Sequence, residues 1–287
     1  MSAFRILAPA KLCSPWLLDE MRGSLGSEIA VETYAREEES RNLISSGSFD
    51  LAALPDTVLL SFLRAGLLLP LAAALPSPLP AEPQFLHHYF DPANQSAWPF
   101  GFTLLAIAGQ GTPAEVPSHW KELADGRMPF RPPSSPIISR FLFAALEHGF
   151  PPPPGSLRSQ AGPVPPRQDG NARIEVDFVQ GLEPRKEGPG WLVRIPVEGS
   201  WIRLFHWAIP RGCANPKRAG TALRELFRPE NLGRYASESF LAVTAREARP
   251  AVPAELLRNP DVYPAESLLD RCIFARVDWL SPTPDAG

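Results

Sequence analysis

The chain has 287 residues, of which 44% are hydrophobic and 21% charged, and its formal net charge is −3. This composition is typical of a folded protein, and the near-neutral charge gives no basis for binding nucleic acid or an anionic membrane surface. The length allows one large domain or two lobes, and the 35 prolines predict many fixed turns and short helices.

The first quarter of the chain predicts two successive strand–helix units after an initial strand and helix. Apolar runs and alternation predict the strands, whereas apolar residues at helical spacing predict the helices. Ser14 before Pro15 is a suitable N-cap for the first helix. The predicted strands are 4–7, 29–34 and 49–54, and the predicted helices are 15–25, 37–45 and 57–65. A parallel sheet is therefore expected, with the turn at Pro55, Asp56 and Thr57 at its carboxyl edge, where α/β proteins hold ligands.

The remainder of the chain alternates less regularly. The segment 150–171 contains PPPPG and GPVPPRQDG and predicts a linker or loop, because it can bury little apolar area. The other predicted strands are 102–108, 174–179, 191–195 and 201–209, and the other predicted helices are 119–126, 137–149 and 216–227.

Patterns of common catalytic and metal sites are missing from the sequence. There is no HExxH, GxSxG, GxGxxG or P-loop pattern, so hydrolases, dehydrogenases and NTPases have no support, and no cofactor is expected. His87, His88 and Asp91 suggest a metal site, but adjacent residues of a strand point to opposite faces, so a surface loop is the better interpretation. The three cysteines are far apart and odd in number, which predicts unpaired thiols.

Neither a secretion signal nor a membrane span is predicted. The N-terminus lacks a basic start and an apolar run before a cleavage site. The apolar stretch 59–75 is interrupted by Arg64, Gly66 and Pro70, and it is shorter than the roughly 20 residues needed to cross a bilayer.

Several segments, in order and over nearly the whole chain, resemble the polyamine-type branch of the bacterial extracellular solute-binding proteins that serve ABC transporters. VETYAREEESRNLISSGSFDLAALP resembles the family's strand, acidic helix and "YDVVVPS"-like strand, and RAGLLLPL resembles its "aGLLqpLD" turn. The segment AIPRGCANPKRAG is similar to "aIPkgAkNkeaA" of the family. The other similar segments are FRILAPAKLCSPWLLDEM, WPFGFTLLAIAG, HWKELADG and NPDVYPAESLL.

The resemblance implies a two-lobed α/β protein of the periplasmic-binding-protein type II fold, each lobe being a mostly parallel sheet flanked by helices. The expected lobes are 1–107 with 208–245, and 108–207 with 246–287. The chain is expected to cross the hinge near residues 106–108 and again near 206–208. A small solute would lie in the cleft between the lobes and be enclosed by hinge closure.

The residues that would form a polyamine site differ from the family's pattern. Polyamine binders surround the ligand with aromatic rings and carboxylates, which attract ammonium groups. Here Pro9, Ala10, Lys11 and Leu12 replace an aromatic and hydroxyl cluster. The family's tryptophan and aspartate of the hinge strand fall at about Arg203 and Phe205. A diammonium ligand would therefore meet added cations, so the resemblance and its departures favour a neutral or anionic solute.

The candidate ligand residues each have a structural alternative. Ser134 and Ser135 at a helix N-terminus suit a carboxylate or phosphate but equally cap the helix. Asp56 and Thr57 either face a ligand or cap the next helix, and Trp98 and Trp201 either face a ligand or pack in the core. Lys11 and Arg203 contact an anion or are simply solvated or paired. The full candidate set is Lys11, Leu12, Asp56, Thr57, Trp98, Ser134, Ser135, Trp201, Arg203 and Phe240.

The sequence therefore predicts a monomeric solute-binding protein without catalytic machinery, whose partner would be an ABC permease. The resemblance implies a periplasmic location, although no signal is visible. The alternative is a cytoplasmic sensor or scaffold that keeps the fold without transport. An enzyme on the same fold has no catalytic pair to support it.

Overall fold

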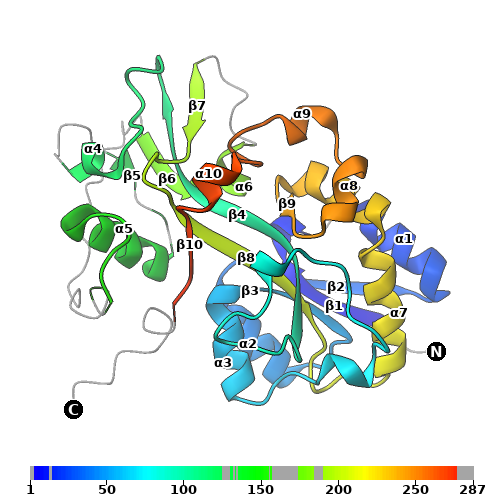
Figure 1. Ribbon diagram of the computed structural model, residues 1–287. Coiled ribbons are helices and arrows are strands. Elements are labelled where there is room, and N and C mark those ends of the chain that lie inside the picture. Colours follow the sequence, from blue (N-terminus) through cyan, green and yellow to red (C-terminus); the bar gives the residue numbers. More distant parts are fainter. Residues whose placement is uncertain are drawn as a thin grey trace, which may run out of the picture. The chain divides into compact units, whose positions relative to one another are not determined.

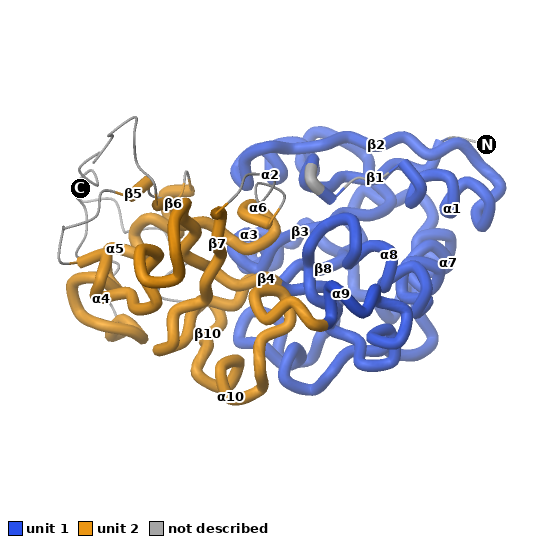
Figure 2. The backbone as a smooth tube through the Cα atoms, turned by 90° about the horizontal axis from the view of Figure 1, so that it is seen from above, with its two compact units in different colours: residues 1–102, 204–257 blue, residues 103–203, 258–287 orange. Residues whose placement is uncertain are grey.

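The computed structural model describes residues 3–12, 15–124, 130–131, 133, 135–154, 156, 174–183 and 190–276. The chain forms two compact units (Figure 2). Unit 1 contains residues 1–102 and 204–257, and unit 2 contains residues 103–203 and 258–287. The chain therefore changes unit at 102/103, 203/204 and 257/258, whereas the sequence predicted 107/108, 207/208 and 245/246.

Unit 1 is built on the parallel strands β1 (Phe4–Pro9), β2 (Ile29–Tyr34) and β3 (Leu51–Pro55). Strand β1 lies between the other two and pairs with β2 along its whole length, from Phe4 opposite Ile29 to Pro9 opposite Tyr34. Strand β8 (Trp201–Ala208) joins antiparallel to β3 through its second half. The carboxyl ends of β1, β2 and β3 thus lie along one edge of the sheet (Figure 1).

Each parallel strand is followed by a helix that buries one apolar side. Helix α1 (Pro15–Leu25) buries Trp16, Leu17 and Met21, which recur at helical spacing. Glu39 accepts hydrogen bonds from two backbone N–H groups at the start of α2 (Glu37–Ser46), as a capping residue does. Helix α3 (Asp56–Arg64) begins directly at the end of β3 and ends before Gly66.

The rest of unit 1 comes from distant parts of the chain. Asn215 caps α7 by accepting a hydrogen bond from the Arg218 N–H, and proline occupies the first position of the helix. Gly220 on this helix lies against the backbone of Ala74. The elements not yet listed are η1 (Ala10–Leu12), η2 (Leu71–Ala73), η3 (Pro83–Phe85), α7 (Pro216–Leu226), α8 (Pro229–Ser239), β9 (Ala242–Val243), η5 (Arg246–Ala251) and α9 (Ala254–Leu257).

Unit 2 has a mixed sheet, which corrects the prediction that each lobe is mostly parallel. Strand β4 (Ala97–Gln110) is paired antiparallel with both β6 (Ile174–Phe178) and β7 (Trp191–Arg194). Parallel pairs join β5 (Phe130–Arg131) to β6 and β10 (Ile273–Phe274) to β8. The helices of this unit are α4 (Trp120–Ala124), α5 (Pro136–His148), α6 (Val179–Leu182) and α10 (Glu266–Leu269).

The core of unit 2 is aromatic. The indole of Trp201 lies 5.1 Å from the ring of Phe141 and 5.9 Å from that of Phe178, measured between ring centroids. Trp120, also buried, donates its indole N–H to the carbonyl of Gly199 at 3.0 Å. These rings belong to one buried cluster that also contains leucine, isoleucine and valine side chains of this unit.

The predicted strands and helices occur in the structure with small shifts at their ends. The largest difference is β4, which begins at Ala97 and is longer than the predicted 102–108. Pro99 lies within β4, whereas the predicted strand 102–108 left this residue in the preceding loop. Ser14, and most of the proline-rich segment 150–171, lie outside the described residues.

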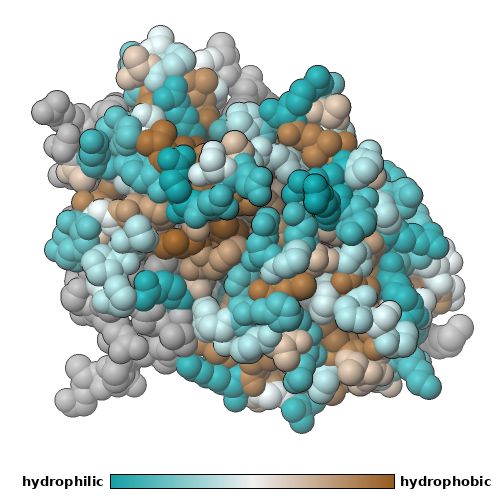
Figure 3. Space-filling model, viewed as in Figure 1, coloured by the Kyte–Doolittle hydropathy of each residue, from teal (hydrophilic) through white to brown (hydrophobic). Residues whose placement is uncertain are grey.

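The face seen in Figure 3 is mostly polar, with hydrophobic residues interspersed. Among the described large hydrophobic residues, Tyr89 and Val197 are the exposed ones. In the parts of the chain that are described, no helix combines the length and apolar character that a membrane span requires.

Candidate functional site

The carboxyl edge of β1, β2 and β3 is the first candidate site, and it lies wholly within unit 1. Three segments follow the three strands there, namely η1 and the first turns of α2 and α3. The Thr57 hydroxyl donates a hydrogen bond to the Glu37 carboxylate at 2.5 Å, which ties the first turns of α2 and α3 together. Two predicted residues, Asp56 and Thr57, are thus adjacent to a third polar residue, Glu37, that the sequence indicated only as part of an acidic helix face.

Asp56 is fully buried as the first residue of α3. Neither of its carboxylate oxygens has a hydrogen-bond partner among the described residues. Burial raises the pKa of Asp56 to about 8, and the nearby backbone of Leu204, Thr57 and Asp56 itself offsets only part of that rise. The carboxyl group therefore carries its proton at neutral pH. Nothing in the local sequence around Asp56 indicates this burial.

The loop after β1 is held by a residue from the far end of the chain. The Tyr235 hydroxyl of α8 donates a hydrogen bond to the Leu12 carbonyl at 3.0 Å. The Leu12 side chain is buried, so it contributes to packing in this structure. The side chain of Lys11 lies outside the described residues.

Trp98 and Phe240 are the other predicted ligand residues of unit 1. The Trp98 indole on β4 is buried, and its N–H has no hydrogen-bond partner among the described residues. Phe240 is half-buried and is the C-cap residue of α8. Its backbone is left-handed, with φ of 55°, and its N–H donates a hydrogen bond to the Ala236 carbonyl. Its backbone thus has the role that glycine more often takes at a helix C-terminus.

In unit 2, Arg203 lies on β8 and is half-buried. Its guanidinium carbon lies 4.9 Å from the centroid of the Phe178 ring, as in a cation–π contact. Stacking on a ring holds the planar guanidinium in one orientation. In the first turn of α6, which follows Phe178, the Gln180 N–H donates a hydrogen bond to the Thr103 hydroxyl at 3.3 Å.

Trp201 and Ser135 both occupy positions with a structural role in unit 2. Trp201 is fully buried against Phe141 and Phe178, which matches the core alternative. Ser135 is the N-cap residue of α5, although its side chain makes no capping hydrogen bond. Ser134 lies outside the described residues.

Two histidines of unit 1, the buried His206 and the half-buried His88, lie beside Phe90 and were not predicted as a group. His206 on β8 lies with its ring 5.5 Å from that of Phe90, and burial lowers its pKa to about 3. The His88 ring stacks on the Phe90 ring with centroids 5.5 Å apart, and burial lowers the pKa of His88 to about 4. The one available signal was a histidine within the apolar run WIRLFHWAI, which indicates an imidazole held neutral in a core.

The histidine and aspartate group at 87–91 does not form a metal site. Asp91 accepts hydrogen bonds from the backbone N–H groups of Gln95, Ser96 and Ala97, so its carboxylate fixes the start of β4. Within the described ranges, no cluster of three or more His, Cys, Asp or Glu side chains is placed to bind a metal ion. Cys213 and Cys272 are free thiols, and Cys13 lies outside the described residues.

Comparisons with known proteins find similarity in structure but not in sequence. No family model and no curated protein matches the chain. The spermidine/putrescine ABC transporter substrate-binding protein PotD of Streptococcus pneumoniae, solved with calcium and HEPES, matches with a TM-score of 0.80 and 18% identity over 96% of this chain and 94% of that one. A putative spermidine/putrescine ABC transporter protein from Listeria monocytogenes matches with a TM-score of 0.79 and 19% identity, covering 96% and 93%.

A third solved structure shows the same likeness. An ABC transporter substrate-binding protein from Bradyrhizobium japonicum matches with a TM-score of 0.73 and 14% identity over 99% of this chain and 96% of that one. The matches cover nearly all of each chain, so the predicted fold class is confirmed: the chain has the fold of the two-lobed periplasmic binding proteins. At identities below 20%, the likeness establishes the fold and leaves the ligand to be argued from the residues.

Proposed function

We propose that this chain is the solute-binding protein of an ABC-type transporter and that it encloses a small neutral or anionic solute by hinge closure. The observation that supports this most is the fold itself, shared over more than nine-tenths of both chains with structures titled as ABC substrate-binding proteins. Those proteins are binding proteins, not enzymes. On this proposal the chain changes no covalent bond in its solute and hands it to a permease.

The charges of the candidate residues support a solute that is not a polyamine. A diamine needs an anionic or aromatic partner for each ammonium group. In unit 2, the corresponding strand carries Arg203 stacked on Phe178, which favours a planar carboxylate over an ammonium group. In unit 1, Asp56 is neutral at pH 7 because it is buried. A ligand role of Asp56 and Arg203 is a prediction, as it is for the other candidates Lys11, Leu12, Thr57, Trp98, Ser134, Ser135, Trp201 and Phe240.

Thermal-shift measurements with two solute panels test the proposed ligand class. Organic anions such as dicarboxylates and amino acids are expected to raise Tm, whereas putrescine and spermidine are expected to leave it unchanged. The Arg203→Ala variant is expected to lose the shift, and Arg203→Lys, which keeps the charge but not the planar fork, to retain only part of it. Arg140→Ala, on α5 of the same unit, is the matched control and is expected to behave as the wild type.

A cytoplasmic sensor or scaffold with the same fold is the second candidate. The substituted polyamine positions favour it, because a protein that has left transport has no need to keep the original ligand site. The two are distinguished by neighbouring genes and by fractionation: adjacent permease and ATPase genes with periplasmic protein favour transport. Protein in the cytoplasm without such genes would contradict the transport proposal.

A further inference from the structure

We propose that residues 86–96 of unit 1 form an acid-sensitive strap, which lifts from β8 as one piece when His88, His206 and Asp91 take up protons, before the unit itself unfolds. The strap connects η3 to β4, and its residues form neither helix nor strand. The inference concerns a conformational change within unit 1 and does not depend on the proposed function.

An aromatic side chain anchors the middle of the strap to the sheet. The buried Phe90 ring meets the His206 ring of β8 edge-on, with the centroids 5.5 Å apart. The His88 ring of the strap itself stacks on the Phe90 ring, with the centroids also 5.5 Å apart. Two imidazoles therefore contact one phenyl ring, and the one on β8 is almost fully enclosed, at 2% exposure.

A carboxylate fixes the end of the strap that leads into β4. Asp91 is buried and accepts hydrogen bonds from the backbone N–H groups of Gln95, Ser96 and Ala97 at 2.8–3.1 Å. Protonation removes the charge that strengthens these bonds and makes one carboxyl oxygen a donor. Acid therefore weakens this turn through Asp91 and the aromatic anchor through the two imidazoles.

The backbone gives the strap less support than a strand receives from its sheet. The N–H groups of Asp91 and Asn94 donate within the strap, to the carbonyls of His88 and Asp91. The carbonyl of Gln95 accepts the N–H of Leu71, at the start of η2, at 2.6 Å. A segment held mainly by side chains and local turns opens at a lower free energy than the core strands of the same unit.

The sign of the pH response follows from the burial of the imidazoles. Burial lowers the pKa of His88 from 6.5 to about 4 and that of His206 from 6.5 to about 3. The neutral rings therefore stabilise the closed strap, and this contribution is lost as pH falls from 6.5 toward these values. In the open strap both rings reach water and bind protons more readily, so acid favours opening. Attraction of a charged ring to Phe90 is the weaker effect, because burying a charge costs more than a cation–π contact returns.

The charged and titratable groups near the two imidazoles do not reverse this response. His87 in the strap lowers the pKa of His88, and His88 lowers that of His206, because the positive charges repel. The strands beside β8, which are β3 and β4, carry no titratable side chain. Asp56 follows β3, and with a pKa raised to about 8 it has no charge in the acid range. Arg203 is three positions from His206 on β8, so it lies on the opposite face of the strand.

Hydrogen exchange on the full chain, without any solute, tests the strap. The strap amides with acceptors, those of Asp91, Asn94, Gln95 and Ser96, are compared with the amides of β1, which is paired on both sides. Protection factors are measured from pH 7 to pH 4 and corrected for the intrinsic exchange rate. Protection of the strap is expected to fall roughly 10-fold or more between pH 6 and pH 4 relative to that of β1.

Variants assign the response to its groups. The double variant His88→Gln with His206→Gln cannot take up these protons and is expected to lose most of the pH response. His88→Gln alone, at a half-buried position, is expected to lose part of it and serves where the double variant folds poorly. Asp91→Asn is expected to lower protection of the strap already at pH 7. His148→Gln, exposed at the end of α5, is the control and is expected to respond as the wild type.

Two results would overturn the inference. Equal losses of protection in the strap and in β1 at every pH would show that acid unfolds unit 1 as a whole. An undiminished pH response in both His88→Gln and the double variant would show that the imidazoles do not control the strap. Since no solute is present, neither result bears on whether the chain binds one.

Discussion

The two units of this chain hold their polar groups in different ways. Unit 1 buries Asp56 at the start of α3 and His206 on the antiparallel strand β8, and both are neutral at pH 7. Unit 2 packs aromatic rings around Trp201 and keeps its ion pair between Arg131 and Glu175 partly exposed. The stability of unit 1 should therefore depend most on pH, and that of unit 2 most on substitutions that remove large side chains from its core.

The largest expected effect is in the core of unit 2. Trp201→Ala removes a fully buried indole that packs between Phe141 and Phe178, and such changes cost about 3–5 kcal/mol of stability. Trp191→Ala, on the half-buried β7, is the control and is expected to cost less. Scanning calorimetry measures the loss, and hydrogen exchange locates it. Unchanged protection of the backbone amides of unit 2 would contradict the aromatic core described above.

A close backbone contact in unit 1 gives the next largest effect. A Cβ atom on Gly220 of α7 would clash with the carbonyl of Ala74, so Gly220→Ala is expected to cost about 1–3 kcal/mol. Gly23→Ala, on α1 with open space around it, is expected to be neutral or slightly stabilising. Urea unfolding measures both. Equal stability of the two variants would show that α7 is able to move away from Ala74.

The pH response of unit 1 is expected to have two opposite contributions. The folded-state pKa of Asp56 is raised from 3.8 to about 8, so its contribution to stability is lost as pH rises across that range. The folded-state pKa of His206 is lowered from 6.5 to about 3, so its contribution is lost as pH falls through that interval.

Each contribution is isolated by a variant. The stability of Asp56→Asn relative to the wild type is expected to rise from pH 5 to pH 8, and that of His206→Gln to rise from pH 6.5 to pH 4. Urea unfolding at several pH values gives these differences. A difference that does not change with pH would show that the group is not buried as described.

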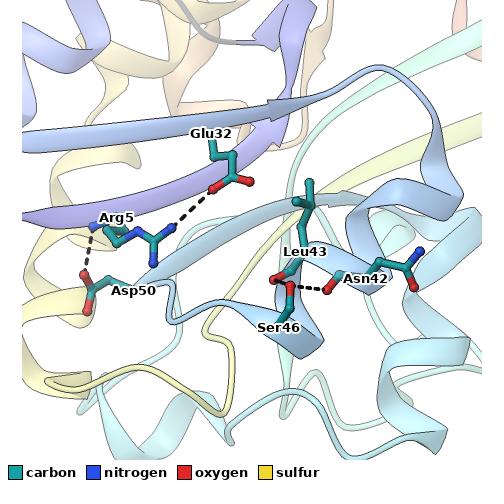
Figure 4. A network of polar contacts seen from close by, with 6 residues as sticks. All are labelled: Arg5, Glu32, Asn42, Leu43, Ser46 and Asp50. Atoms are coloured by element: carbon teal, nitrogen blue, oxygen red, sulfur yellow. Dashed lines mark hydrogen bonds and ion pairs between the residues drawn. The ribbon is translucent and has the colours of Figure 1, made fainter.

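The smallest effect is expected at the surface of unit 1. Arg5 and Glu32 form an ion pair at 3.2 Å in which both side chains are more than two-fifths exposed (Figure 4). Such pairs contribute about 0–1 kcal/mol, so Glu32→Gln is expected to change stability little, and less so in high salt. Asp50 differs because it accepts the Arg5 backbone N–H at 2.9 Å, and Asp50→Asn tests that bond. A larger loss for Glu32→Gln than for Asp50→Asn would reverse this ranking.

The strands and helices of unit 1 were predictable because βα units carry strong local signals. Helix α1, for example, was predicted with the bounds it has, from its apolar spacing and from Gly26 after it. The places where the chain changes unit were shifted, because β4 and β8 continue through 102/103 and 203/204 without any turn. A continuous strand carries no composition signal of a domain boundary.

The turn that carries Asp56 and Thr57 was predictable from the sequence, but the electrostatics of Asp56 were not. A turn after a parallel strand is visible in the sequence, so Asp56 and Thr57 were identified. The burial that protonates Asp56 depends on β8, which lies about 150 positions farther along the chain. Trp201 shows the reverse case, since a tryptophan in an apolar strand suits a core and a ligand site equally until its neighbours Phe141 and Phe178 are known.

The central claim, that this chain binds a small solute, is tested most directly by native mass spectrometry. The full chain is incubated with a metabolite extract, freed of unbound solutes, and measured under non-denaturing conditions before and after collisional activation. We expect one small molecule per chain, released on activation, whose mass corresponds to a neutral or anionic compound. A spectrum of solute-free protein from every extract, together with no thermal shift in either panel, would contradict the claim.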